Sequence, residues 1–102
     1  MAITKQFLKS KPECKVKFTL NAEETAGCET LALVGDFNSW DPAATPMKKQ
    51  KNGSFSATLT LPAGVSYKFR YLADGNRWFN DPAADGYAYC PFAEGENAVL
   101  QL

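Results

Sequence analysis

Apolar and polar residues alternate with a period of two along much of this chain. The pattern is clearest in residues 14–20, 55–61 and 67–71. Successive side chains of a β-strand point to opposite faces, so this period is typical of strands with one buried face. Residues 31–34 are continuously apolar, as expected of a central strand. The alternation assigns eight side chains to the core: Val16, Phe18, Leu33, Phe55, Leu59, Phe69, Tyr71 and Leu100.

Turn-forming residues separate these segments at intervals of roughly ten residues. Asn52-Gly53 and Asp74-Gly75 are typical hairpin turns, and shorter strands are expected around 77–79 and 97–102. Residues 3–9 and 21–26 are candidates for a single helical turn, because no helical spacing continues over three turns. The pattern predicts an all-β fold, a two-sheet β-sandwich of about seven short strands, with a small barrel as the alternative.

Length and composition favour one ordinary globular domain. The chain has 102 residues, 45% of them hydrophobic and 22% charged, which argues against disorder. We therefore predict a single domain over residues 1–102, in which residues 1–12 form an N-terminal extension or an edge segment.

The charged and sulfur-containing residues exclude several classes of function. Eleven basic and eleven acidic residues cancel, which gives no support to a nucleic acid as partner. Lysines crowd the start of the chain and acidic residues its end, and this asymmetry is interpreted as a solvated first strand and an acidic last loop. Three cysteines without paired spacing, and no visible secretory signal, fit a reducing cytoplasm. No segment is long and apolar enough to cross a membrane.

The absence of histidine argues against an enzyme. It removes the commonest general base and every Ser-His or Cys-His nucleophile pair. Asp36, Asp41, Asp74, Asp81 and Asp85 lie beside Gly, Pro, Asn or Ala, where aspartate commonly forms turns. A calcium role for them is a lesser alternative, and zinc has no histidine and only scattered cysteines to bind it. We expect neither a metal nor another cofactor.

Two tryptophans carry the most informative chemistry. Trp40 follows a strand end in Gly-Asp-Phe-Asn-Ser-Trp-Asp-Pro, and Trp78 follows the turn Asp74-Gly75. Period two sends Lys68 and Arg70 to the outer face of their strand, where Trp78 is expected to lie across from them. An indole face stacks on a sugar ring while a cation donates to hydroxyls. The same residues also suit a protein-binding hot spot, or a bracing role without any ligand.

Four ordered motifs, GDFNSWDP, NGSF, LPAGVSYKFRYLADGNRWFNDP and ENAVLQL, resemble carbohydrate-binding module family 48 over roughly residues 14–102. This is the early-set, immunoglobulin-like domain of isoamylases, pullulanases and glycogen branching enzymes. The chain is also similar to the glycogen-binding domain of the AMP-activated protein kinase β subunit. The resemblance implies an immunoglobulin-like (early-set) sandwich and non-catalytic binding of α-1,4-glucan such as glycogen, starch or malto-oligosaccharide.

The resemblance also implies a set of binding residues. The stacking tryptophans fall on Trp40 and Trp78, the strand lysine on Lys68, and the asparagine before the last strand on Asn97. Arg70 is a further candidate. Where the kinase group has a leucine-containing loop, this chain has residues 91–94, and Phe92 is the candidate in its place. The alternative function is a module that docks on a glucan-active enzyme or a kinase without binding sugar itself.

Overall fold

The computed structural model describes residues 2–25, 27–90 and 95–102. In these residues nine strands and one short 3-10 turn follow one another along the chain. They are β1 (Ala2–Phe7), β2 (Glu13–Leu20), β3 (Leu31–Gly35), η1 (Asp36–Asn38), β4 (Lys48–Lys49), β5 (Phe55–Pro62), β6 (Ser66–Ala73), β7 (Arg77–Phe79), β8 (Gly86–Cys90) and β9 (Gly95–Gln101).

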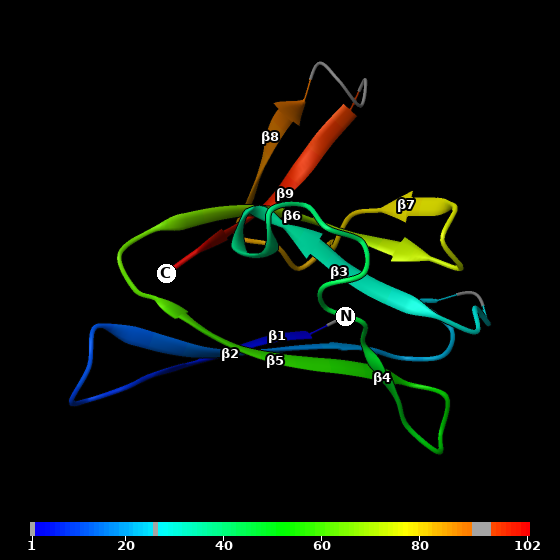
Figure 1. Ribbon diagram of the computed structural model, residues 1–102, viewed down its shortest axis with the longest axis horizontal. Helices are drawn as coiled ribbons and strands as arrows, with labels where there is room; N and C mark the ends of the chain where they lie inside the picture. The colour runs from blue at the N-terminus through cyan, green and yellow to red at the C-terminus, as the bar shows by residue number, and fades with distance from the viewer. Residues whose placement is uncertain (1, 26, 91–94) are drawn as a thin grey trace.

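The strands form two antiparallel sheets that lie one over the other (Figure 1). The first sheet has the order β1-β2-β5-β4, and the second has the order β3-β6-β9-β8, with β7 paired to β6. Consecutive strands do not always pair with each other: β3 follows β2 in sequence but lies in the other sheet, where it pairs with β6. The prediction of an all-β, immunoglobulin-like two-sheet sandwich is confirmed.

Three strands were not predicted, and one expected helical turn is wrong. Residues 3–9 lie largely in β1, where Ile3 pairs with Phe18 along the edge of the first sheet. Strand β4 has two residues, too few for any sequence period. Strand β8 contains Tyr87 and Tyr89 in alternation, a pattern that does indicate a strand and was overlooked.

The core lies between the two sheets and is rich in aromatic rings. Phe18 of β2 and Phe69 of β6 are fully buried and meet edge to face, with their ring centroids 5.4 Å apart. Phe69 makes a similar contact with Tyr71 at 5.8 Å. Each such buried side chain contributes on the order of 2 kcal/mol through its removal from water. Of the eight predicted core side chains, seven are buried and Leu59 is partly buried.

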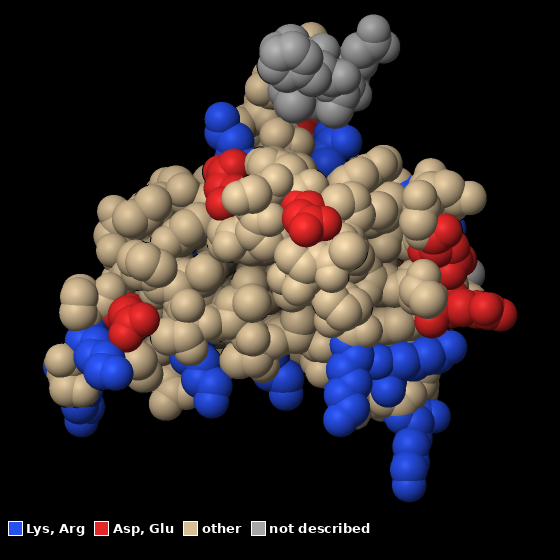
Figure 2. Space-filling view, in the orientation of Figure 1, with Lys and Arg blue, Asp and Glu red and all other residues tan. Residues whose placement is uncertain are grey.

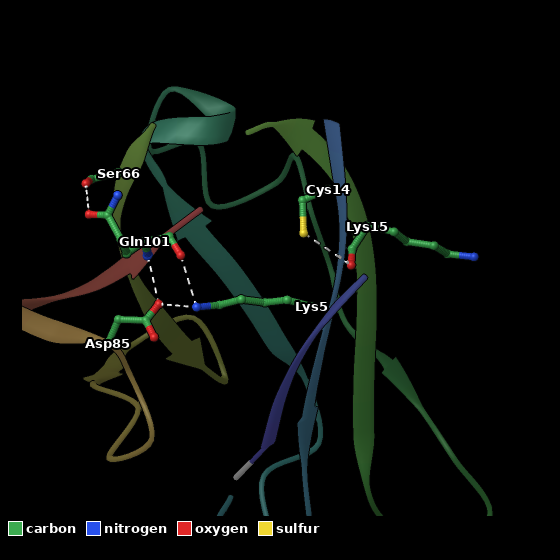
Figure 3. A network of polar contacts seen from close by, with 6 residues as sticks. All are labelled: Lys5, Cys14, Lys15, Ser66, Asp85 and Gln101. Atoms are coloured by element: carbon green, nitrogen blue, oxygen red, sulfur yellow. Dashed lines mark hydrogen bonds and ion pairs between the residues drawn. The ribbon is translucent and has the colours of Figure 1, made fainter. Parts of the chain in front are cut away.

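A polar contact joins the edge of the first sheet to the second sheet (Figure 3). Lys5 Nζ of β1 donates to Asp85 Oδ2 at 2.6 Å and to the carbonyl of Gln101 at 3.0 Å. The Gln101 N–H donates to the same carboxylate oxygen at 2.8 Å. Burial opposes ionisation of Asp85, but these hydrogen bonds and the lysine charge outweigh it and lower the pKa of Asp85. The contact therefore ties the edge strand β1 to the second sheet.

Strand β6 changes partners halfway along its length, and this change positions the functional region. Its first half pairs with β9, from Ser66 to Phe69, and its second half pairs with β7, from Tyr71 to Ala73. Its other edge pairs with β3 along residues 31–35. Strands β7 and β9 thus follow one another along the same edge of β6, with Arg70 at their junction.

Candidate functional site

The outward face of the second sheet carries most of the candidate residues. In β6, Tyr67, Phe69 and Tyr71 are buried, so period two sends Lys68 and Arg70 outward. Leu72 continues this outward row and pairs with Trp78 of β7. The prediction that Lys68, Arg70 and Trp78 share one face of the sheet agrees with this register.

The turn after β3 is built to hold Trp40 beside that face. Asn38 accepts from the Gly35 N–H at 3.0 Å and donates to the carbonyl of Leu33 at 2.8 Å. Its amide also donates to Thr45 Oγ1 at 3.0 Å, which ties the following loop to the turn. A Cβ at Gly35 would lie 2.5 Å from the carbonyl oxygen of Lys68, so the close approach of β3 and β6 requires glycine here.

Asp36 connects the two candidate elements directly. Its Oδ1 accepts from Trp40 Nε1 at 2.9 Å, and its Oδ2 accepts from the backbone N–H of Lys68 at 2.8 Å. The sequence predicts Asp36 as a turn residue, with calcium binding as the lesser alternative, whereas the structure shows that it also joins η1 to β6. One carboxylate therefore fixes the indole of Trp40 next to the strand that carries the Lys68 side chain.

The backbone at Trp40 is strained. Ser39 and Trp40 both have φ of 58°. This left-handed region is uncommon for bulky residues and costs of order 1 kcal/mol or more. A large, partly exposed ring is thus held in an unfavourable backbone conformation by the hydrogen bonds around it. Unfavourable backbone conformations of this kind persist only where neighbouring contacts hold them, and they are concentrated at functional sites. The conformation of Trp40 therefore favours a functional role for this residue.

Trp78 forms one wall of an apolar trough. The side chain of Trp78 is 45% exposed. The trough has a volume of about 380 Å³ and is lined by Thr30, Leu31, Ala32, Pro42, Pro46, Leu72, Gly75 and Trp78. The prolines belong to the loop after Trp40, which the isolated bridge between Ala32 and Pro46 joins to β3. The trough therefore lies between the two tryptophan-bearing segments.

Arg70 and Asn97 are less available than the sequence suggested. The Arg70 guanidinium donates to the carbonyl oxygen of Glu96 through both Nε and Nη2, at 3.2 and 2.5 Å. Asn80 Nδ2 donates to the same carbonyl at 2.6 Å, so these side chains bind the start of β9. Asn97 lies on β9 and is only 7% exposed. Phe92 lies outside the described residues.

A buried carboxylate anchors the segment that follows Trp78. Asp81 is fully buried, and its Oδ2 accepts from the Tyr71 hydroxyl at 2.7 Å. Its Oδ1 accepts from the Ala83 N–H at 2.7 Å, and its carbonyl accepts from the Tyr87 hydroxyl at 2.6 Å. Burial, and then the charge and hydrogen bond of Asp81, raise the pKa of Tyr71 far above its ordinary value. Tyr71 thus stays protonated as the donor.

Asp74 fixes the other end of β7. Its Oδ1 accepts from the backbone N–H groups of Thr30 and Glu29, at 3.0 and 2.9 Å. These two hydrogen bonds lower the pKa of Asp74. The loop before β3 and the turn before β7 are therefore joined at the end of the trough, and Trp78 is held from both sides.

The described residues give no sign of metal chemistry. In residues 2–25, 27–90 and 95–102, no three acidic, cysteine or histidine side chains are arranged to hold a metal ion. Cys14 and Cys28 are buried and free. No helix in this part of the chain has the length and apolar character needed to cross a membrane.

Comparison with known proteins gives a family and relatives of one kind. The family model described as the glycogen recognition site of AMP-activated protein kinase matches residues 16–86. The 1,4-alpha-glucan branching enzyme GlgB of Aquifex aeolicus (strain VF5) is 30% identical over 88 residues, which are 82% of this chain and 14% of that enzyme. The 1,4-alpha-glucan branching enzyme GlgB 2 of Xanthomonas campestris pv. campestris (strain 8004) is 37% identical over 49 residues, 46% of this chain and 7% of that enzyme. The chain thus spans a small part of the length of these relatives.

Proposed function

The chain belongs to the family of the glycogen recognition site of AMP-activated protein kinase, and we propose that it binds α-1,4-glucan without catalysing its conversion. The family is described as a recognition site, which supports carbohydrate binding. The relatives are named as 1,4-alpha-glucan branching enzymes, which supports an α-1,4 linkage in the proposed ligand. Glycogen, starch and malto-oligosaccharides all carry this linkage and are the proposed ligands.

The exposed indole of Trp78 beside an apolar trough is the observation that carries the proposal. An indole with 45% of its surface in water is costly unless a flat partner covers it. The C–H face of a glucose ring is such a partner. We propose that one glucose unit stacks on Trp78, with the glucan continuing over the neighbouring residues of β6.

The remaining candidates take distinct roles in this proposal. Leu72 of β6 pairs with Trp78, and Lys68 lies four residues before Leu72 on the same strand. At about 3.3 Å per residue, the Lys68 Cα is therefore about 13 Å along β6 from the residue opposite Trp78. That separation suits a ligand of several sugar units rather than one. Trp40 supplies a second stacking face beside Lys68, whose ammonium donates to hydroxyls. Asn97 and Arg70 contribute less, because one is nearly buried and the other is bonded to Glu96.

The expected affinity is modest. An indole face that covers one glucose removes about 80 Å² of apolar surface from water, which is worth about 2 kcal/mol. Two such faces and a few hydrogen bonds of about 1 kcal/mol each must offset the ordering of a flexible ligand. The balance corresponds to dissociation constants between about 10 µM and the millimolar range.

The aspartates around the candidate site support binding rather than catalysis. Asp36, Asp74 and Asp81 each accept two hydrogen bonds through their side chains, within the turns and strands that they hold together. A glycosidase needs two carboxyl groups that flank the bond to be cleaved. Carboxylates committed to local structure are poorly placed for that role. A glucan-active enzyme is instead proposed as a partner of the module.

The rival function is docking on a protein through the same tryptophans, without sugar. It rests on the same exposed indole, since Trp and Arg are also the commonest protein-binding anchors. Calorimetric titration separates the two. Maltoheptaose should bind the native chain, whereas cellohexaose, a β-linked glucan, should bind at least tenfold more weakly.

Two variants localise the binding. Trp78→Ala should weaken maltoheptaose binding by roughly tenfold or more, because about 2 kcal/mol exceeds the 1.4 kcal/mol of one factor of ten. Phe7→Ala is the matched control, because Phe7 is an aromatic side chain 56% exposed on the first sheet. It should leave the affinity unchanged. Equal affinity in folded Trp78→Ala protein would contradict the proposed site.

A further inference from the structure

The charges of this neutral chain are separated between different parts of the fold. Residues 2–20 and 48–62, which contain all strands of the first sheet, hold eight lysines and the single acidic residue Glu13, a net charge of +7. Residues 21–47 hold five acidic residues and no basic one. The lower edge of the molecule in Figure 2, where the first sheet lies in Figure 1, is accordingly lined with basic side chains.

Strand register places three of these lysines on the outer face of the first sheet. Lys15 pairs with Gln6 and Thr60, and Lys17 pairs with Thr4 and Thr58. These rows alternate with the buried rows of Cys14, Val16 and Phe18, so their side chains point away from the core. In Figure 3, Lys15 extends away from the sheet on the side opposite to Lys5.

Lys48 completes the group at the other edge of this sheet. It pairs with Ser56, which pairs in turn with Thr19. We call these residues the lysine face: Thr4, Gln6, Lys15, Lys17, Thr19, Lys48, Ser56, Thr58 and Thr60. Apart from the lysines, its side chains are hydroxyls and one amide. Glu13, two residues before Lys15 on the same side of β2, is the one carboxylate on this side of the described sheet and lies at its end. The face contains no large apolar group.

The lysines of this face have no internal charge partner among the described residues. Lys5 is different, because it points to the other side of β1 and pairs with Asp85 at 2.6 Å. Within residues 2–25, 27–90 and 95–102, no carboxylate forms an ion pair with Lys15, Lys17 or Lys48. Lys15 and Lys17 lie on β2 and Lys48 lies on β4, with β5 between them. Like charges on one face repel one another and therefore add no stability to the isolated domain. Their concentration on one face is explained better by an external anion.

We propose that the lysine face docks an acidic protein surface. Lysine also binds phosphate, but nucleic-acid sites combine it with arginine forks or aromatic stacking, and the face offers neither. Membrane surfaces are bound by basic groups together with apolar or aromatic side chains that insert, which the face also lacks. A lysine ammonium is a point charge that pairs with a carboxylate without a fixed geometry, and the interleaved Thr and Ser hydroxyls both donate and accept hydrogen bonds.

The dimensions of the face indicate a weak and reversible complex. The central strands β2 and β5 have eight residues each and are about 27 Å long, and the four strands span about 14 Å between the outermost two, β1 and β4, which are shorter. The resulting area of about 400 Å² is half of what one partner buries in a standard interface. Electrostatic attraction then mainly raises the association rate constant, and the affinity should fall strongly as the salt concentration rises.

The lysine face and the proposed glucan site lie on opposite sides of the sandwich, since each is the outer face of a different sheet. Both faces are therefore available at the same time. A module of this kind would hold an acidic protein next to an α-glucan. The docking proposal does not depend on the sugar-binding proposal, because the two share no residue.

Polyglutamate is the probe that tests the charge chemistry. We expect it to shift the backbone amide resonances of β2, β4 and β5 in the native chain, with at least tenfold weaker binding when salt rises from about 50 to about 500 mM. The triple variant K15Q/K17Q/K48Q should lose at least tenfold in affinity. The matched control K15R/K17R/K48R keeps the charge and should stay within about twofold of the native chain.

Four results would overturn the proposal. A shift pattern centred on the second sheet would do so, and so would an unchanged affinity in the folded glutamine variant. Tighter binding of double-stranded DNA, or of vesicles that contain phosphatidylserine, than of polyglutamate would also overturn it. Saturation with maltoheptaose provides an independent check, because polyglutamate should bind equally well in its presence if the two faces are separate.

Discussion

Removing the hydroxyl of Tyr71 should destabilise the fold far more than one methyl-sized change normally does. Tyr71 and Asp81 are both fully buried, and the hydroxyl donates to Asp81 Oδ2 at 2.7 Å. In Tyr71→Phe the ring keeps its contacts with Phe69 and Phe79, whose centroids lie 5.8 and 5.4 Å away. The change therefore isolates the hydrogen bond.

The magnitude follows from the charge and the burial. A hydrogen bond to a charged group contributes about 1.5–3 kcal/mol, and the buried Asp81 Oδ2 left without its donor adds a desolvation penalty, while Oδ1 keeps its hydrogen bond from the Ala83 N–H. We expect Tyr71→Phe to lower the free energy of unfolding by about 2–4 kcal/mol, a large part of the roughly 5–15 kcal/mol of a typical domain. Tyr87→Phe is the control, because its hydroxyl donates to the neutral carbonyl of Asp81. It should cost about 1 kcal/mol.

Urea unfolding at neutral pH, followed by tryptophan fluorescence, measures both variants against the native chain. A second comparison in an Asp81→Asn background removes the charge, and the cost of Tyr71→Phe should fall there to about 1 kcal/mol. The reasoning is refuted if Tyr71→Phe lies within about 0.5 kcal/mol of the native chain. It is also refuted if Tyr87→Phe is the more destabilising change.

Three further changes have defined outcomes. Gly35→Ala should destabilise the fold by about 2 kcal/mol or more in urea unfolding, because the new Cβ would lie 2.5 Å from a β6 carbonyl oxygen; a cost below 0.5 kcal/mol would contradict this close approach. The pKa of Asp74 is lowered by backbone hydrogen bonds, so its stabilisation is present above the unfolded pKa of about 3.9 and is lost as pH falls through the lower folded value. Asp74→Asn should therefore flatten the acid limb of the stability–pH curve, and an unchanged limb would show that another group causes it. Trp40→Phe removes the indole N–H that binds Asp36, and should weaken maltoheptaose binding by a few-fold in calorimetry; a tighter complex would show that the indole is held away from the ligand.

Strand patterning made the fold predictable, because one buried face imposes period two on the sequence. Phe69 and Tyr71 are buried while Lys68 lies outward, as this period requires. The same argument failed for β1, where an edge strand has little buried surface and the alternation of Ile3 and Lys5 is weak. Strand β1 is held in place by long-range hydrogen bonds from Lys5 to Asp85 and Gln101, which the local sequence does not reveal.

The outward direction of Lys68 and the exposure of Trp78 could be predicted, since both depend on local strand geometry. The hydrogen bond from Trp40 to Asp36 could not be predicted. Asp36 joins Trp40 to β6 only because the fold brings the Lys68 N–H, 32 residues later, next to its carboxylate. Asp81 was missed for the same reason. Its neighbours in sequence indicate a turn, whereas its burial is decided by Tyr71, ten residues earlier.

Charge separation was visible in the sequence but its meaning was not. The lysine-rich start of the chain suggested only a solvated first strand. Lys48, far along the sequence, joins Lys15 and Lys17 on one face only because β5 connects β2 with β4. Net neutrality therefore concealed a strongly basic surface, and the fold was needed to find it.

The two indole N–H resonances provide the most direct test of glucan binding at the proposed site, because Trp40 and Trp78 are the only tryptophans in the chain. Maltoheptaose should be added to the folded protein while the nitrogen–proton NMR signals of both indoles are followed. The account predicts that the Trp78 signal shifts progressively and saturates, and that the Trp40 signal shifts along the same binding curve. Two unchanged indole signals at millimolar maltoheptaose would contradict it.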